Sequence, residues 1–290
     1  QLLRNADAAL FKAKSSGRNG YALYTEELTA HAQKRVEIAF ELRRALEQQE
    51  LRVYYQPVHD LKTSRLIGVE ALVRWQHPQR GLVSPAEFIP IAERTGLIAE
   101  IDAWVMQEAC QQMCQWQQAG VVLAFVAVNV SSRLFARREL YQQVAQVLRE
   151  TGLDPAYLEL EVTESAVMDD PEVALEQMHR LRELGVRLAI DDFGTGYSSL
   201  LRLKRLPVQK LKIDQGFVAG LPWDEDDAAI VRVIIALAQS MGMQVHAEGI
   251  EQVEQAAFLL EQSCDLGQGY WFGRPVPPGQ LDWMHAPVIA

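Results

Sequence analysis

The chain contains eight apolar runs, and most of them are followed by a stretch with helical spacing. Such regular alternation of strands and helices is typical of parallel sheets. Eight units over about 240 residues predict a (β/α)8 TIM barrel, an α/β fold, better than an open sheet. A doubly wound sheet is the alternative, and its ligands would also bind at the strand carboxyl ends. The predicted strands are 51–56, 66–72, 123–130, 157–163, 187–192, 209–214, 244–249 and 264–268.

Each predicted strand ends in a polar or charged residue. In a barrel, residues at the carboxyl ends of the strands face one common mouth. That mouth would hold five carboxylates, an asparagine, a lysine and two glutamines. Any one of these residues could be a solvated charge or a turn former, but their recurrence at strand after strand favours a site. The residues are Gln56, Glu70, Asn129, Glu161, Asp191 with Asp192, Lys212, Glu248 and Gln268.

The chemistry of this set points to metal ions and phosphate. Oxygen ligands suit Mg²⁺ or Mn²⁺, and the lack of histidine in the set argues against a zinc-type site. Five carboxylates give −5, which two divalent ions and Lys212 would balance with +5. Two ions about 3.5–4 Å apart can stabilise both the attacking and the leaving oxygen when a phosphoryl group is displaced. Lys212 could hold the attacking water and Arg74 a substrate phosphate, so we expect metal-assisted hydrolysis of a phosphate ester.

Residues 191–199, Asp-Asp-Phe-Gly-Thr-Gly-Tyr-Ser-Ser, form a second pattern. Two glycines after adjacent acids allow a tight turn that could couple the acids to a neighbouring surface. An ordinary loop with a helix cap at Ser198 or Ser199 is the alternative. Below the strand ends, Glu159 could pair with Lys210 one layer deeper. His246 shares a strand face with Glu248, and a structural hydrogen-bonding role is favoured for it.

The first part of the chain does not fit the barrel. Residues 1–24 have the spacing of one helix and one short strand, which cannot close a core of their own. Residues 26–48 are predicted to form an amphipathic helix that could connect two domains or pack against the barrel. Its apolar positions are Leu28, Ala32, Val36, Ala39, Leu42 and Leu46.

Composition narrows the class of protein. A hydrophobic content of 49% in 290 residues is ample for a globular core, and a net charge of −10 makes a broad footprint for duplex nucleic acid improbable. The apolar stretches are too short to span a bilayer. Three cysteines suit a reducing cytosol, and Cys110 and Cys114 are expected to pack in the core. Because the chain starts at Gln1 rather than Met, we expect a piece of a longer protein.

Many separated motifs together resemble the EAL family of cyclic di-GMP phosphodiesterases. The motif that names the family is Glu70-Ala71-Leu72, and the resemblance covers residues 48–284. Three letters alone carry no weight, whereas the ordered set is highly specific. The other motifs are Tyr55-Gln56-Pro57, Glu87-Phe88-Ile89-Pro90, Val128-Asn129-Val130-Ser131, Glu161-Val162-Thr163-Glu164-Ser165, Asp191-Asp192-Phe193-Gly194-Thr195-Gly196-Tyr197-Ser198-Ser199, Leu211-Lys212-Ile213-Asp214, Ala247-Glu248-Gly249-Ile250-Glu251 and Gly267-Gln268-Gly269-Tyr270.

The resemblance implies a modified barrel with an antiparallel first strand. It also implies hydrolysis of cyclic di-GMP to linear pGpG with two Mg²⁺ or Mn²⁺ ions per site, and inhibition by Ca²⁺. His246 lies where the family more often has an aliphatic residue. The implied first-metal ligands are Glu70, Asn129, Glu161 and Asp191; Asp191 would bridge to a second metal near Asp192 and Glu248. The implied catalytic residues are Glu70, Asp191, Lys212, which would orient the water, and Glu248.

Further roles follow from the same resemblance. Gln56 and Arg74 would contact the substrate, and Gln268 would contact the substrate or complete the shell of the water or metal. Glu164 would anchor the loop after Asp192, a loop that this family ties to dimerisation and activation. A homodimer through the barrel is therefore expected.

The tail resembles the end of a GGDEF diguanylate cyclase domain, without the cyclase signature. The expected organisation is a GGDEF remnant at 1–25, a linker helix at 26–47 and an EAL domain at 48–287. We expect GGDEF or sensor domains upstream and a cytoplasmic location, with or without a membrane anchor elsewhere in the parent protein. No membrane contact by this fragment is expected. The tail carries the motifs Ala6-Asp7-Ala8-Ala9-Leu10-Phe11, Ala13-Lys14 and Gly17-Arg18-Asn19.

Two other functions are alternatives to the phosphodiesterase. One is a catalytically silent cyclic di-GMP receptor that signals through residues 26–48, against which the complete ligand set counts. The other is a carboxylate-based glycosidase on a barrel. Lys212 and the Asp191–Asp192 pair fit phosphate chemistry better than sugar chemistry.

Overall fold

The computed structural model describes residue 21 and residues 26–137, 139–195 and 200–283. The chain divides into two compact units. One consists of residues 1–51 and 75–97, and the other of residues 52–74 and 98–290.

The larger unit contains a closed ring of strands in the order β1-β9-β8-β7-β6-β5-β4-β2, which the pairing of β1 with β2 completes. Strands β2 and β4–β9 pair in parallel, whereas β1 runs antiparallel to β9. The predicted modified barrel is thus confirmed, and an open doubly wound sheet is wrong because the ring closes. The strands are β1 (Leu51–Asp60), β2 (Leu66–His77), β4 (Phe125–Val130), β5 (Leu158–Thr163), β6 (Arg187–Phe193), β7 (Lys210–Ile213), β8 (Gln244–Ala247) and β9 (Leu266–Gly267).

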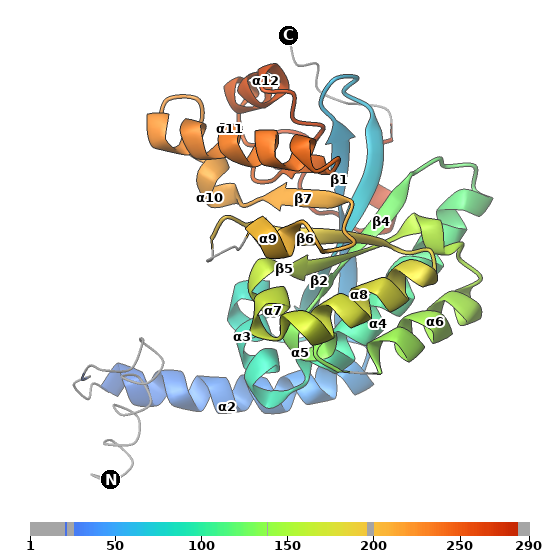
Figure 1. Cartoon of the computed structure of the whole chain (residues 1–290). Helices are drawn as coiled ribbons and strands as arrows, with labels where there is room; N and C mark the ends of the chain where they lie inside the picture. Colours follow the sequence, from blue (N-terminus) through green and yellow to red (C-terminus); the bar gives the residue numbers. More distant parts are fainter. Residues whose placement is uncertain (1–20, 22–25, 138, 196–199, 284–290) are drawn as a thin grey trace. The chain divides into compact units, whose positions relative to one another are not determined.

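Helices connect most of the parallel strands and cover the outside of the barrel (Figure 1). Their ends follow local rules, as α8 shows. Asp170 accepts a hydrogen bond from the Val173 backbone, Pro171 occupies the first turn, and Gly185 follows with a φ of 96°. The helices are α4 (Ile98–Gln118), α5 (Ser132–Phe135), α6 (Leu140–Thr151), η1 (Pro155–Tyr157), α7 (Glu164–Asp169), α8 (Pro171–Glu183), α9 (Leu200–Leu203), α10 (Gln215–Val218), α11 (Glu225–Ser240), α12 (Val253–Glu261) and η2 (Pro278–Gln280).

The barrel interior is layered. Its lower part is an apolar cluster of Val58, Phe125, Ala127 and Leu266. The Lys210 ammonium lies 3.8 Å from the centre of the Phe125 ring and 2.6 Å from Glu159 Oε1. The ion pair that was expected below the strand ends is therefore present, and its lysine also packs on the apolar layer. Buried charges are tolerable only when paired in this way.

The smaller unit contains α2 (Glu26–Glu47), the end of β2, β3 (Gly81–Val83) and α3 (Pro85–Thr95). A helix over 26–48 was predicted correctly, but its apolar face was not. Ile38, Leu42 and Ala45 are buried, whereas Val36 is 73% exposed. The buried stripe is offset because Glu41 faces the hairpin of β2 and β3, where it lies 3.1 Å from Arg80.

Some predictions fall wholly or partly outside the described residues. These are the GGDEF remnant at 1–25, apart from residue 21, the loop at 196–199, and the end of the EAL domain at 284–287. Across the described part of the chain, no helix is long and apolar enough to cross a membrane.

The tight contact between β2 and the apolar layer gives a test of the fold. A Cβ added at Gly68 would lie 2.5 Å from the tip of the Phe125 ring. Overpacking of this kind typically costs about 1–3 kcal/mol. We expect Gly68→Ala to lower the free energy of unfolding, measured by urea denaturation, by that amount. Gly279→Ala is the control, because its Cβ would meet nothing within 4 Å; equal midpoints for both variants would contradict this packing.

Candidate active site at the carboxyl ends of the strands

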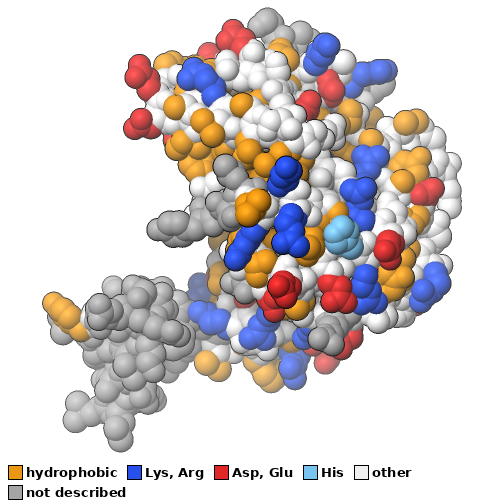
Figure 2. Space-filling model, viewed as in Figure 1, with side chains coloured by type: hydrophobic (Ala, Val, Ile, Leu, Met, Phe, Trp, Pro, Cys, Tyr) orange, Lys and Arg blue, Asp and Glu red, His pale blue; other side chains and the backbone are white. Residues whose placement is uncertain are grey.

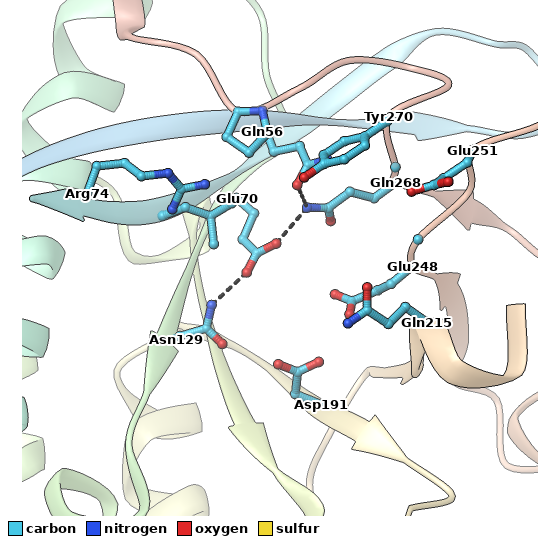
Figure 3. A pocket seen from close by; sticks show the side chains of 14 residues that line it. Gln56, Glu70, Arg74, Asn129, Asp191, Gln215, Glu248, Glu251, Gln268 and Tyr270 are labelled. Carbon is cyan, nitrogen blue, oxygen red and sulfur yellow. Dashed lines mark hydrogen bonds between the residues drawn. The ribbon is translucent and has the colours of Figure 1, made fainter. Parts of the chain in front are cut away.

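A pocket of about 390 Å³ opens at the carboxyl ends of the parallel strands (Figure 3). Seven predicted residues line it, and they come from six different strands or the turns that follow them. Glu161 and Lys212 are almost fully buried, and they belong to the same cluster of charges. Asp192 and Glu164 do not line the pocket. The seven lining residues are Gln56, Glu70, Arg74, Asn129, Asp191, Glu248 and Gln268.

Two of these residues do not stand where the strand pattern placed them. Gln56 lies in the middle of β1, which continues to Asp60, and Glu70 lies in the first half of β2. They reach the pocket for different reasons. β1 is antiparallel to its neighbour β9, so the middle of β1, and not its carboxyl end, lies at the level of the pocket. β2 is extended beyond the barrel by its hairpin with β3.

Lys212 lies at the centre of the acidic cluster. Its Nζ atom is 2.6 Å from both Glu161 Oε2 and Glu248 Oε1. Asp191 Oδ1 lies at 3.2 Å and Glu70 Oε1 at 4.0 Å. Burial alone would lower the pKa of Lys212, but the surrounding carboxylates, Asp191 foremost, raise it well above its usual value. The lysine therefore stays charged and balances part of the acid cluster.

Glu70 is held by two side-chain amides. Asn129 Nδ2 donates to its Oε1 atom at 2.6 Å, and Gln268 Nε2 donates to its Oε2 atom at 2.6 Å (Figure 3). Gln268 also donates to Gln56 Oε1 at 3.1 Å. A cation bound between Glu70 and Asn129 would require the Asn129 amide to turn its oxygen inward. Such a turn is a simple rotation about the last side-chain bond.

Asp191 and Asp192 reach the same site because β6 is irregular. Neighbouring residues on a strand normally point to opposite faces. Here the register with β7 shifts between Ile190 and Phe193, and Asp192 has a φ of 51°. As a result, Asp191, Asp192 and Glu248 each offer an oxygen within 4.8 Å of the others. Bulges often re-aim side chains next to active sites in this way.

Three carboxylates of the cluster have raised pKa values. Burial, and then the charge of Asp191, raises the pKa of Asp192 to about 6. Burial raises the pKa of Glu248 to about 8 against the opposing effect of Lys212. Burial also raises the pKa of Glu161 well above its usual range. The fully buried Glu161 Oε1 atom has no hydrogen-bond partner among the described residues. An unmatched acceptor in an acid cluster fits a divalent cation well.

Glu164 has a different place in the structure. It is buried at the start of α7, and its Oε2 atom accepts a hydrogen bond from the Gly194 backbone at 3.0 Å. It therefore holds the segment that follows Asp191 and Asp192. This contact is the one expected of a loop anchor.

The pocket also contains residues that the strand pattern missed. Gln215 lines it from the start of α10, and Glu251 and Tyr270 line it from loops, together with Leu72 and Pro275. Gln215 follows Lys212 by three positions, Glu251 follows Glu248 by three, and Tyr270 follows Gln268 by two. Counting two or three residues past each strand-end group would have found them, because loops after barrel strands line the mouth.

The EAL domain model matches residues 40–275, which is most of the chain. The chain belongs to the EAL domain family. The EAL domain found here is 47% identical to a bifunctional diguanylate cyclase/cyclic di-GMP phosphodiesterase, MucR, of Pseudomonas aeruginosa, over 97% of this chain. It is 43% identical to the cyclic di-GMP phosphodiesterase NbdA of the same organism, also over 97% of the chain.

The chain spans only 41% of MucR and 36% of NbdA. Among solved structures, the PaMucR phosphodiesterase in its c-di-GMP complex superposes with a TM-score of 0.82 at 47% identity. That match covers 84% of this chain and 99% of the solved one. A similar EAL enzyme, Bd1971, in its cAMP- and cyclic di-GMP-bound form, matches with a TM-score of 0.80 at 34% identity, over 86% of this chain and 68% of that one.

The raised pKa values predict how divalent cations bind. Protons held by Asp192, up to about pH 6, and by Glu248, up to about pH 8, compete with a cation for the same oxygens. Affinity for Mn²⁺ should therefore rise with pH between 6 and 8, by up to roughly tenfold per pH unit for each proton displaced. Calorimetric titration with Mn²⁺ at three pH values measures this. Glu248→Gln should flatten the upper part of the dependence, and a flat profile for the unaltered chain would contradict it.

Proposed function

We propose that this EAL domain is a cyclic di-GMP phosphodiesterase that hydrolyses its substrate to linear pGpG with Mg²⁺ or Mn²⁺. The acid cluster of Glu70, Glu161, Asp191, Asp192 and Glu248 around one buried lysine carries the proposal. It adjoins a pocket of about 390 Å³, within the usual range for small-molecule sites. The relatives named for this activity, MucR and NbdA, support the choice of substrate.

In this proposal the protein groups have separate tasks. Glu70, Asn129, Glu161 and Asp191 would hold one divalent ion, and Asp191, Asp192 and Glu248 the second. Bound ions would supply positive charge that polarises a phosphoryl oxygen and favours deprotonation of a water. Ca²⁺, with its larger radius and looser coordination, is expected to occupy the site without supporting turnover.

The remaining groups orient water and substrate. Lys212 holds Glu161, Asp191 and Glu248 in place, and its ammonium would fix the attacking water next to Glu248. Before a cation binds, Glu248, with its pKa of about 8, can hold a proton near neutral pH. Arg74 is half-buried at the pocket wall, where its guanidinium lies 5.8 Å from the centre of the Tyr54 ring and would face a substrate phosphate. Gln56 and Gln268 would contact the substrate or its water.

The same function includes an assembly. We propose that two copies pair through the barrel side that carries α9 and α11. Leu201 is 75% exposed, and Val233 is 67% exposed. Figure 2 shows hydrophobic, Lys and Arg side chains gathered on the face where these two helices lie. α9 and the turn after it carry three basic residues, and the first turn of α11 is acidic, so two copies related by a twofold axis are complementary in charge.

Turnover and metal binding give the first test. Glu70→Ala removes a proposed metal contact and frees the amides of Asn129 and Gln268. We expect loss of more than about a hundredfold in kcat, because even outer partners of metal ligands contribute 10–100-fold. Formation of pGpG with Mn²⁺ is the measurement, and Glu172→Gln on the outside of α8 is the control. Retained activity in Glu70→Ala would refute the assignment.

The unaltered chain decides between enzyme and receptor. Binding of cyclic di-GMP without any pGpG, with both Mg²⁺ and Mn²⁺ supplied, would favour a silent receptor. Turnover that Ca²⁺ suppresses would support the enzyme.

The assembly is tested by replacing Val233 with glutamate. We expect the Val233→Glu chain to be monomeric in light scattering at a concentration where the unaltered chain is a dimer. Val122→Glu, at a valine that is 91% exposed in the loop before β4, is the matched control. An unaltered chain that is monomeric at all concentrations, or a dimer that persists in Val233→Glu, would reject this surface.

A further inference from the structure

His246 is a buried polar side chain that neither holds a metal ion nor contacts the substrate in the proposed reaction. It faces the barrel interior from β8, between Lys212 on β7 and Leu266 on β9, and is 1% exposed. Neither ring nitrogen has a hydrogen-bond partner in the part of the chain that the structure describes. A buried polar group left unpaired costs about 1–3 kcal/mol, so a partner is expected close by.

Gln268 has the complementary deficit. Its Nε2 atom donates to Glu70 and to Gln56, but its buried Oε1 atom accepts nothing from the described residues. Gln268 follows Leu266, the register partner of His246, by two positions, so both side chains face the interior from adjoining strands. Gln268 is also close enough to the His246 ring to raise its pKa, as a hydrogen-bond acceptor would, without a bond of good geometry being formed. One N–H···O bond between them would satisfy the Gln268 oxygen and one of the two His246 ring nitrogens.

The two neighbouring lysines do not supply the missing hydrogen-bond donor to Gln268 Oε1. In this structure the Lys212 ammonium lies within 3.2 Å of Glu161, Glu248 and Asp191 and points to these carboxylates. Lys210 donates to Glu159 and lies against Phe125. Burial and then these two positive charges lower the pKa of His246 well below its usual value. In either protonation state the ring carries at least one N–H donor.

We propose that His246 is a positioning residue for the phosphodiesterase site. It donates a hydrogen bond to Gln268 Oε1 and fixes the amide with its nitrogen toward Glu70. A reversed amide would place an oxygen against the Glu70 carboxylate, where it repels. In the fixed orientation, Gln268 holds Glu70 in line with Asn129, 2.6 Å away. His246 thus acts on metal binding and turnover through Gln268, without touching the substrate.

The inference rests on the proposed function, and three variants test it. His246→Met removes the N–H donor and keeps a long unbranched side chain, whereas His246→Gln and His246→Asn place amide donors near the two ring nitrogens. We expect Met to weaken Mn²⁺ binding and lower kcat by roughly tenfold each, with KM nearly unchanged, as for other outer partners of metal ligands. At least one of the two amides should restore most of both.

A measurement on the unaltered chain keeps the test independent of variant folding and of activity. Nitrogen-15 NMR of the histidine rings, assigned with His246→Gln, should show a His246 N–H that exchanges slowly with water. A rapidly exchanging ring would overturn the inference.

The outcomes separate this inference from the proposed function. A chain that cleaves no cyclic di-GMP refutes the function, while Mn²⁺ calorimetry and NMR still decide the role of His246. His246→Met with kcat and Mn²⁺ affinity within twofold of the unaltered chain would overturn that role. So would equal losses in Met, Gln and Asn, because they would show that the ring's shape, and not its donor, matters.

Discussion

One buried cation organises the mouth of this barrel. Lys212 lies within 4.0 Å of four carboxylates, and almost none of its surface reaches solvent. Charges at such distances interact far more strongly in a protein interior than in water. If the lysine were absent, the acids around it would have to take up protons or move apart. The orientation of Glu161, Asp191 and Glu248 therefore follows from the position of one ammonium group.

The antiparallel first strand supplies the neutral part of the same site. Because β1 crosses the wall against its neighbours, Gln56 meets Gln268 from β9, and Gln268 meets Glu70 from β2. The ring of strands and the chain of amide hydrogen bonds thus close at the same place. The neutral Gln268 amide holds one Glu70 oxygen without adding charge, and the other oxygen is open to a cation once the Asn129 amide turns.

The site could be predicted from the sequence where the strands are regular. Asn129 and Glu161 are direct register partners on β4 and β5, and each lies one or two residues before the end of its strand. Asp191 and Asp192 were expected together at the mouth, but the way they reach it, by a shift of register and a positive φ, could not be predicted. Alternation along an ideal strand would have sent Asp192 away from the mouth.

Strand lengths and helix faces were harder to predict for a related reason. Glu70 was expected at a strand end, but β2 runs on into a hairpin that hydrophobic pattern alone does not announce. Val36 was expected to be buried, but the polar contacts of Glu41 set a different buried face on α2, and Val36 is exposed. In both cases a partner distant in sequence decides the outcome. Local pattern predicts an element, whereas its ends and its buried face depend on what it packs against.

The two ionic layers of the barrel show how structural and functional charges differ. In the lower layer one acid, Glu159, meets one cation, Lys210, at 2.6 Å, and the charges balance. In the upper layer one cation meets four acids, and a buried oxygen of Glu161 is left without a donor among the described residues. A balanced pair needs nothing further, but an excess of buried negative charge is costly. The excess of negative charge in the upper layer therefore indicates a site where positive charge from outside the chain can bind.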